Sequence, residues 1–177
     1  MNPDKTHKAL FIVNMLKDFV EDGAPLQVPA AKGIVENIAG EIRYAREKGR
    51  PIIYICDRHD SDDPGFEFWP AHAVKGTSGA EIIDELVPRA GDHIVEKVSY
   101  SGFYKTNLEA LMDELEIDDV LICGVITNTC ILYTAVDALQ RGIKVIVPET
   151  CVAALDQDDQ KFALRQIHQI LKPVGRE

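Results

Sequence analysis

Short, almost wholly apolar segments alternate along this chain with segments whose apolar residues recur at helical spacing. Apolar runs of this kind are typical of strands in a parallel sheet, because the connecting helices cover both faces of such a sheet. Within segment 31–48, Ile34, Ile38 and Ile42 form one apolar stripe that must pack on a sheet. The pattern predicts a three-layer α/β/α fold, a Rossmann-like parallel sheet with helices on both faces. The predicted strands are 9–13, 51–56, 93–95, 120–123 and 143–147, and the predicted helices are 31–48, 80–86, 108–115, 130–141 and 157–171.

Length and charge limit the classes of protein that the chain can belong to. Its 177 residues, 46% of them hydrophobic, fit one domain over 1–177 that buries about 70% of its unfolded surface. The formal charge of -10 is spread along the chain, which argues against nucleic acid or an anionic membrane as a partner. No apolar run approaches a membrane span, and the first residues contain no signal-peptide core, so we expect a cytoplasmic protein. The four cysteines lack disulfide or zinc-knuckle spacing and are expected to be reduced.

Polar residues follow three of the predicted strands, in segments 14–18, 57–59 and 124–130. Ligands of open parallel sheets bind beyond the carboxyl ends of the strands, so these three segments are expected to meet in one site. Segment 57–78 is longer than the ~12–15 residues usual for loops in compact domains, and it leaves directly from a strand end. We therefore expect it to form a wall of the site, although a plain surface excursion is the alternative.

Cys130 stands where the apolar run 120–123 gives way, after Gly124, to a helical pattern. The unpaired backbone N–H groups and the dipole at a helix start favour an anion, so a thiol there is expected to ionise more easily. The same N–H groups can stabilise the oxyanion that forms when the sulfur attacks a carbonyl. From position alone, a buried cysteine that packs as a small hydrophobic side chain stays an open alternative.

Five motifs, in order and over nearly the whole chain, resemble those of the isochorismatase-like cysteine hydrolases. That superfamily includes nicotinamidase, carbamoylsarcosine amidase and ureidoacrylate amidohydrolase. The resemblance implies a parallel α/β fold, assembly into a dimer or tetramer, and hydrolysis of small amides by an aspartate, a lysine and a cysteine through a thioester, with no cofactor required. The motifs are Phe11-Ile-Val-Asn-Met-Leu-Lys-Asp-Phe19, Cys56-Asp-Arg-His59, Trp69-Pro-Ala-His72, Lys97-Val-Ser-Tyr-Ser-Gly-Phe103 and Gly124-Val-Ile-Thr-Asn-Thr-Cys130.

The resemblance assigns roles to individual residues. Cys130 is the expected nucleophile and Lys97 the expected lysine of the triad. An ammonium group near the sulfur would favour the thiolate. The resemblance also implies a cis peptide bond between Val125 and Ile126, with the N–H groups of Ile126 and Cys130 forming the oxyanion hole. The third catalytic position is residue 14, where this chain has Asn14.

Asn14 departs from the family pattern, because an amide cannot hold the proton that the family's aspartate takes from the thiol and returns to the departing amine. A positioned general base contributes about a hundred to ten-thousand-fold to a rate, so turnover is expected to be impaired. The chain is then an engineered variant, a natural member with altered chemistry or a non-catalytic relative. Asp18 matches the second acidic position of the motif, and we expect it to be structural.

Asp57, His59 and His72 are candidate ligands of a divalent metal, since a carboxylate and two imidazoles suit zinc, iron or manganese. Nicotinamidases carry a further histidine, which segment 60–68 does not supply. Hydrogen-bonded support of the pocket is therefore favoured over a bound metal for these residues.

Trp69, Tyr100, Phe103 and Asn128 are expected to line the substrate pocket. Alternatively, Tyr100 and Phe103 only pack, and Asn128 caps the following helix. The favoured interpretation is a cysteine-dependent amidohydrolase whose partner is a small-molecule amide. The alternatives are a non-catalytic protein that binds a small molecule in the same pocket, and a vinyl-ether hydrolase of the isochorismatase type. Cys130 argues against the vinyl-ether hydrolase, because that reaction does not need the thiol.

Overall fold

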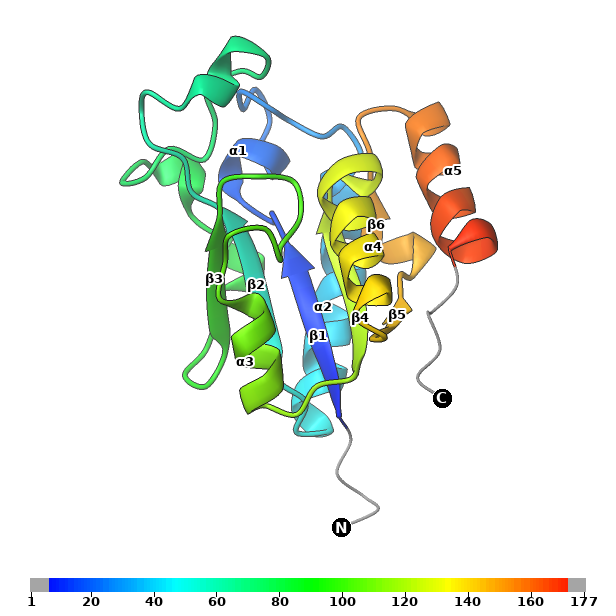
Figure 1. Ribbon diagram of the computed structural model, residues 1–177. Helices are drawn as coiled ribbons and strands as arrows, with labels where there is room; N and C mark the ends of the chain where they lie inside the picture. The colour runs from blue at the N-terminus through cyan, green and yellow to red at the C-terminus, as the bar shows by residue number, and fades with distance from the viewer. Residues whose placement is uncertain (1–6, 172–177) are drawn as a thin grey trace.

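A six-stranded parallel sheet forms the centre of the computed structural model, which describes residues 7–171 (Figure 1). The strand order is β3-β2-β1-β4-β5, and the short β6 pairs with β4. Every pairing is parallel, which confirms the predicted α/β architecture. The strands are β1 (Lys8–Val13), β2 (Ile52–Asp57), β3 (His93–Lys97), β4 (Asp119–Val125), β5 (Lys144–Ile146) and β6 (Val152–Ala153).

Helices cover both faces of the sheet, as Figure 1 shows with α2 behind it and α3 and α4 in front. Successive side chains of a strand point to opposite faces, so β1 contributes to two cores. Leu10 and Ile12 pack in the core that contains the apolar stripe of α2, whereas Phe11 and Val13 pack in the core under α3 and α4. The helices are α1 (Lys17–Val20), α2 (Ala31–Glu47), α3 (Leu108–Glu114), α4 (Leu132–Gln140) and α5 (Gln157–Arg165).

The predicted helix over 80–86 is wrong. The structure has two short 3-10 turns there, Ser78–Ala80 and Asp84–Leu86, joined by extended backbone. The extended part pairs with the segment after β1, because Ile83 donates its N–H to Met15 at 3.1 Å and Ile82 forms a bridge with Leu16. Tertiary pairing of the backbone thus overrides the local helical pattern.

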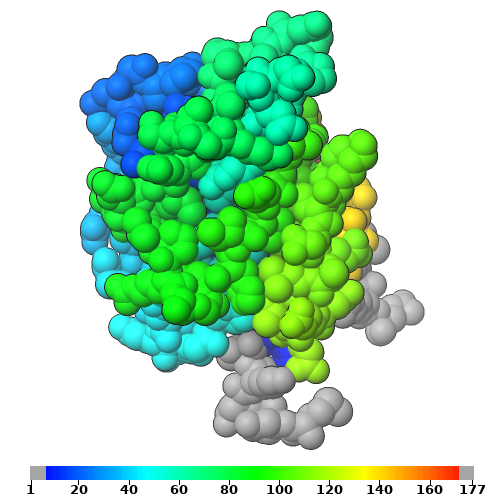
Figure 2. All heavy atoms as spheres, turned by 90° about the vertical axis from the view of Figure 1, so that its left-hand side faces the viewer, coloured from blue at the N-terminus to red at the C-terminus, as the bar shows by residue number. Residues whose placement is uncertain are grey.

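The segment 58–77, which follows β2 and contains the 3-10 turn Pro64–Glu67, rises above the carboxyl edge of the sheet. In Figure 2 it is the teal and green surface at the top of the molecule. Asp18, at the start of α1, accepts a hydrogen bond at 2.8 Å from the backbone N–H of Ala73 in this segment. Asp18 therefore fastens the loop to the end of β1, which agrees with the structural role expected for it.

All helices of the described chain are short. The longest is α2, with 17 residues. Between residues 7 and 171 no helix combines the length and the apolar character that a membrane crossing requires.

Gly124 in β4 lies opposite Val13 of β1, and its φ of +117° is in the region that favours glycine. A Cβ atom at this position would lie 2.0 Å from the carbonyl oxygen of Val13. We predict that Gly124→Ala lowers the free energy of unfolding by about 3 kcal/mol or more, measured by urea denaturation. Gly23→Ala is the control, since Gly23 also has a positive φ but no atom within 4 Å of the added Cβ, and should cost about 1–2 kcal/mol. Equal losses in the two variants would contradict the steric argument.

Candidate active site

Four buried polar side chains meet at the carboxyl edge of the sheet, one from each of four adjacent strands. Asn14 follows β1, Asp57 ends β2 and Lys97 ends β3, while Cys130 lies in a π-helical turn, Thr127–Ile131, after β4. Asp57 and Lys97 are direct partners in the register of β2 and β3. All four residues are at most 5% exposed, so their polar atoms must find partners within the protein.

The sulfur of Cys130 receives two nitrogen donors. Lys97 Nζ and Asn14 Nδ2 each lie 3.4 Å from Cys130 Sγ. The hydroxyl of Thr129 is more distant, at 4.0 Å. Because an ammonium and an amide N–H both donate, the surroundings of the sulfur are arranged to stabilise a negative charge on it.

Asp57 is the carboxylate of this cluster. Its Oδ1 accepts a hydrogen bond from Lys97 Nζ in a buried ion pair, and its Oδ2 accepts one from Asn14 Nδ2 at 2.8 Å. The backbone N–H of Asp57 in turn donates to Asn14 Oδ1 at 2.9 Å, which fixes the orientation of the amide. Lys97 Nζ also donates a hydrogen bond to the carbonyl oxygen of Ser99 at 2.7 Å. Asp57 is therefore joined to Cys130 through two bridges, one amide and one ammonium.

The charges in the cluster set the protonation states of Lys97 and Cys130. Burial alone would lower the pKa of Lys97, but the carboxylate of Asp57 and the sulfur raise it to about 12, so Lys97 stays an ammonium. Burial raises the pKa of the Cys130 thiol above its usual value, and the nearby Lys97 offsets this only in part. The expectation that the thiol ionises more easily is not met, because desolvation outweighs the effects that favour the anion.

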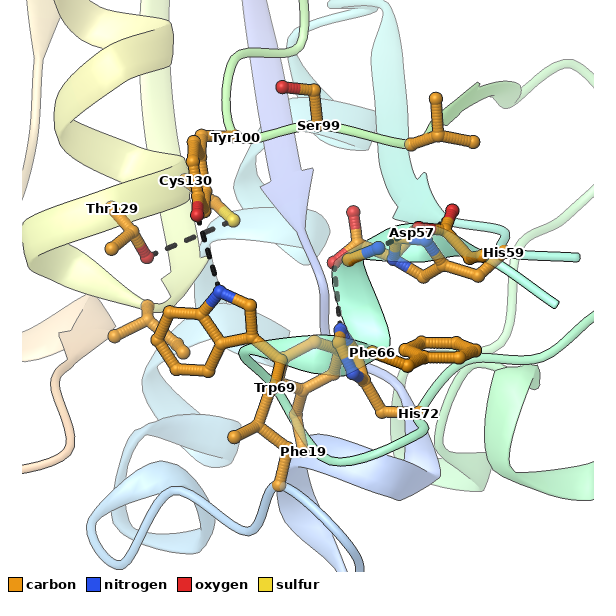
Figure 3. A pocket seen from close by; sticks show the side chains of 15 residues that line it. Phe19, Asp57, His59, Phe66, Trp69, His72, Ser99, Tyr100, Thr129 and Cys130 are labelled. Atoms are coloured by element: carbon orange, nitrogen blue, oxygen red, sulfur yellow. Dashed lines mark hydrogen bonds and ion pairs between the residues drawn. The ribbon is translucent and has the colours of Figure 1, made fainter. Parts of the chain in front are cut away.

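A pocket of about 300 Å³ opens above the cluster, with Cys130 and Asp57 among its lining residues (Figure 3). Two of the residues expected to line it do so, Trp69 and Tyr100, and Trp69 Nε1 donates a hydrogen bond to Tyr100 Oη at 3.2 Å. Phe19 and Phe66 add aromatic surface that the sequence patterns did not single out. The charged lining residues are both acidic, Asp57 and Asp63, and no lysine or arginine is among the described residues that line the pocket.

Phe103 and Asn128, also expected at the pocket, are not among its lining residues. Phe103 is buried in the core under α3 and α4, where the guanidinium group of Arg141 lies 4.6 Å from its ring centre. Asn128 is partly buried in the π-helical turn next to Cys130. The correction for Phe103 has a simple cause: its motif continues past the strand end and turns back onto the helical layer.

The bend between β4 and Cys130 contains the expected cis peptide bond, between Val125 and Ile126. Ile126 and Cys130 both line the pocket. Their assignment as the oxyanion hole stays a prediction.

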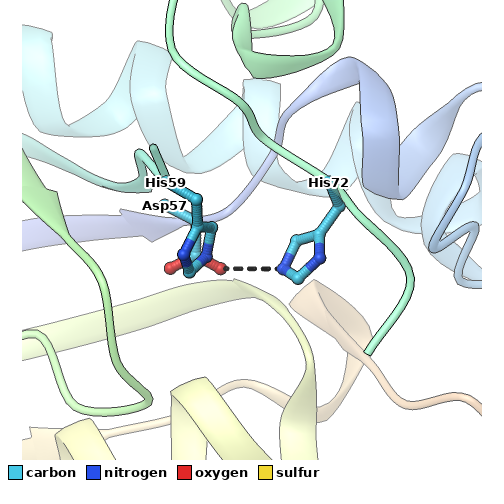
Figure 4. A group of neighbouring side chains, drawn as sticks. All are labelled: Asp57, His59 and His72. Atoms are coloured by element: carbon cyan, nitrogen blue, oxygen red, sulfur yellow. Dashed lines mark ion pairs between the residues drawn. The ribbon is translucent and has the colours of Figure 1, made fainter. Parts of the chain in front are cut away.

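Asp57, His59 and His72 offer three ligand atoms within 4.8 Å of one another (Figure 4). Each imidazole is oriented through Nδ1, that of His59 by Asp63 Oδ2 at 2.9 Å and that of His72 by the carbonyl oxygen of Pro70 at 2.6 Å. The Nε2 atom of His72 then lies 3.9 Å from Asp57 Oδ2. The three groups could reach one ion in this geometry.

The carboxylate of this set already has partners within the protein. Asp57 already neutralises the buried ammonium of Lys97, and both of its oxygens accept hydrogen bonds. A bound divalent ion would add two positive charges beside that ammonium, and the second carboxylate of the pocket, Asp63, is hydrogen-bonded to His59. The geometry would allow a metal ion, and the preference for hydrogen-bonded support of the pocket stays a prediction.

We predict that Cys130 reacts with iodoacetamide slowly at pH 7 and that its rate rises with a midpoint above about 8.5, the value for an ordinary cysteine. The thiolate is the reactive form, and burial raises the pKa of this thiol. Lys97→Met should move the midpoint higher still, because it removes the cation that favours the thiolate. Lys75→Met, which changes an exposed lysine of the pocket loop, is the control and should leave it unchanged. Peptide mass spectrometry across pH gives the rates, and a midpoint below 8 in the unaltered protein would contradict the prediction.

Comparison with known proteins agrees with the fold and the motifs. The isochorismatase domain model matches residues 8–176. Over 167 residues, 94% of this chain and 92% of the relative, the sequence is 31% identical to YaaI, an uncharacterized isochorismatase family protein of Bacillus subtilis.

Two solved structures give the same result. The structure of N-carbamoylsarcosine amidase from Thermoplasma acidophilum has a TM-score of 0.83 and 38% identity, covering 90% of this chain and 91% of that one. Pyrazinamidase of Pyrococcus horikoshii, in complex with zinc, has a TM-score of 0.87 and 32% identity, covering 91% and 94%. The chain thus belongs to the isochorismatase-like hydrolase family, whose named relatives include amidases.

Proposed function

We propose that this protein is a cysteine amidohydrolase that cleaves the carbon–nitrogen bond of a small amide. The observation that carries the proposal is the position of Cys130 Sγ at the base of a pocket, with N–H donors from Lys97 and Asn14 at 3.4 Å. Membership of a family with amidase relatives supports amide hydrolysis in general.

In the proposed reaction the sulfur of Cys130 attacks the amide carbonyl carbon. The carbonyl oxygen becomes an oxyanion, which the backbone N–H groups of Ile126 and Cys130 hold. The carbon–nitrogen bond then breaks, and the nitrogen leaves as ammonia or an amine after it gains a proton. Water attacks the resulting thioester, which releases the carboxylic acid and restores the thiol. Lys97 stays positively charged throughout and stabilises the sulfur anion.

The substrate that the pocket fits best is a small, flat and uncharged amide. Aromatic side chains of Phe19, Phe66, Trp69 and Tyr100 supply flat apolar surface for a ring or an unsaturated chain. Lys97 neutralises Asp57, but Asp63 adds a further carboxylate to the pocket wall. A substrate with its own carboxylate would find no lysine or arginine partner among the described lining residues.

A non-catalytic protein that binds the same small molecule is the second candidate, and Asn14 is the observation that favours it. Such a binding protein differs from the hydrolase in one measurable respect. A binder is stabilised against thermal unfolding by an amide that it never converts.

We predict that the protein releases ammonia from at least one small amide and that Cys130→Ala lowers kcat at least ~10³-fold, because the thioester can no longer form. Cys151→Ala is the matched control, since Cys151 is also a buried free cysteine but is not among the residues lining the pocket. An ammonia assay and intact-mass detection of the acyl-enzyme provide the two readouts. Stabilisation by an amide without turnover or acyl-enzyme would favour the binder instead.

We also predict a preference for uncharged over anionic substrates. Pyrazinamide, the amide named in one relative, should have kcat/KM at least ~10-fold above that of N-carbamoylsarcosine, the anion named in the other. The reason is that a substrate carboxylate meets the carboxylate of Asp63 and finds no lysine or arginine among the described lining residues. Raising the salt concentration should narrow the difference in kcat/KM between the two substrates. A higher kcat/KM for the anion would contradict the assignment of substrate class.

A further inference from the structure

The chemistry of this site needs a carboxylate, and the carboxylate in the cluster is Asp57. We propose that Asp57, and not residue 14, is the carboxylate that takes the proton of the Cys130 thiol and returns it to the departing nitrogen. The inference rests on the proposed function, amide hydrolysis by Cys130. It replaces the interpretation in which Asn14 leaves the site without a proton acceptor.

The groups that touch the sulfur cannot accept its proton. Asn14 is an amide, Lys97 is a charged ammonium held by Asp57, and the hydroxyl of Thr129 is not a base near neutral pH. Within residues 7–171 no imidazole nitrogen forms a hydrogen bond with Cys130 Sγ. Because burial keeps Cys130 protonated at rest, attack requires an acceptor one step further out. That group is Asp57, which is hydrogen-bonded to both nitrogen donors of the sulfur.

The ammonium of Lys97 provides a route for the proton from the thiol to Asp57, since it donates both to Asp57 Oδ1 and to Cys130 Sγ. As the S–H bond breaks, Lys97 passes one of its protons to Asp57 and receives the proton of the thiol. The products are a thiolate and a neutral carboxylic acid, and the lysine is unchanged.

The same route returns the proton. When the carbon–nitrogen bond breaks, Asp57 gives its proton to the leaving nitrogen and becomes a carboxylate again. In the second half of the reaction Asp57 takes a proton from the attacking water and passes it to the departing sulfur. The sum is amide plus water to acid plus ammonia or amine, with the enzyme restored.

Asn14 matches a charged Asp57 better than an aspartate would. Its Nδ2 donates to Asp57 Oδ2 at 2.8 Å, and its Oδ1 accepts the backbone N–H of Asp57 at 2.9 Å. A carboxylate at position 14 would bring two negative oxygens into contact, and one of the two groups would have to stay protonated. Asn14 is therefore a positioning residue that orients the working carboxylate.

The test moves the carboxylate between the two positions. Asp57→Asn should lower kcat by about 10²–10⁴-fold, as expected for the loss of a positioned base. The double variant N14D/D57N puts a carboxylate back into the cluster, next to the sulfur, and should recover at least ~10-fold of that loss. N14D alone should not exceed the unaltered protein. Asp60→Asn is the control. It changes an exposed carboxylate in the loop that follows Asp57, and the variant should retain full activity.

Each contrary result has a distinct meaning. Unchanged activity of D57N, or a gain of ~100-fold or more in N14D, would overturn the role of Asp57 while leaving the hydrolase proposal intact. Loss of activity on dialysis against EDTA would overturn it too, because Asp57 would then act through a metal. N14D keeps Asp57 and so remains decisive if D57N does not fold. If neither the unaltered protein nor N14D forms an acyl-enzyme or releases ammonia from any amide tested, the hydrolase proposal itself fails.

Discussion

The buried ion pair between Lys97 and Asp57 is the interaction on which the site depends. A lysine whose side chain is fully enclosed needs a counter-ion, since an unpaired charge in the interior costs several kcal/mol. The register of β2 and β3 brings the two residues together at the strand ends, so the sheet itself builds the pair. Asn14 and Cys130 are then positioned around it, because Asn14 contacts the pair from the end of β1 and Cys130 contacts it from the turn after β4.

Much of the fold could be predicted from the sequence, because burial on both faces leaves an almost uninterrupted apolar pattern in β1, β2 and β4. The predicted helix over 31–48 is confirmed as α2 for a similar reason, since one apolar stripe determines which side packs. The segment 80–86 could not be predicted in this way, because its backbone partners lie near Met15, far away in sequence. The two-residue β6 is too short to leave a pattern at all.

The site, like the fold, has features that the sequence could predict and features that it could not. The sequence motifs indicated which side chains gather at the sheet edge, and the structure brings Asn14, Lys97 and Cys130 within contact distance. The sequence could not show that Asp57 binds Lys97, because that contact depends on strand register rather than on local spacing. Nor could it show the extent of burial, which reverses the expected direction of the pKa of Cys130. Residue identity was readable from the chain, whereas desolvation and charge pairing required the assembled sheet.

The hydrogen bond between Asp18 and the backbone of Ala73 has a consequence for how such proteins diversify. The bond uses a main-chain N–H, so it holds the far end of the pocket loop whatever side chains the loop carries. Residues between the two anchored ends can then change in evolution without disturbing the strand ends that carry the reacting groups. The part of the pocket wall that the loop supplies, with Phe66 and Trp69, is thus held independently of the strand ends that carry the reacting groups.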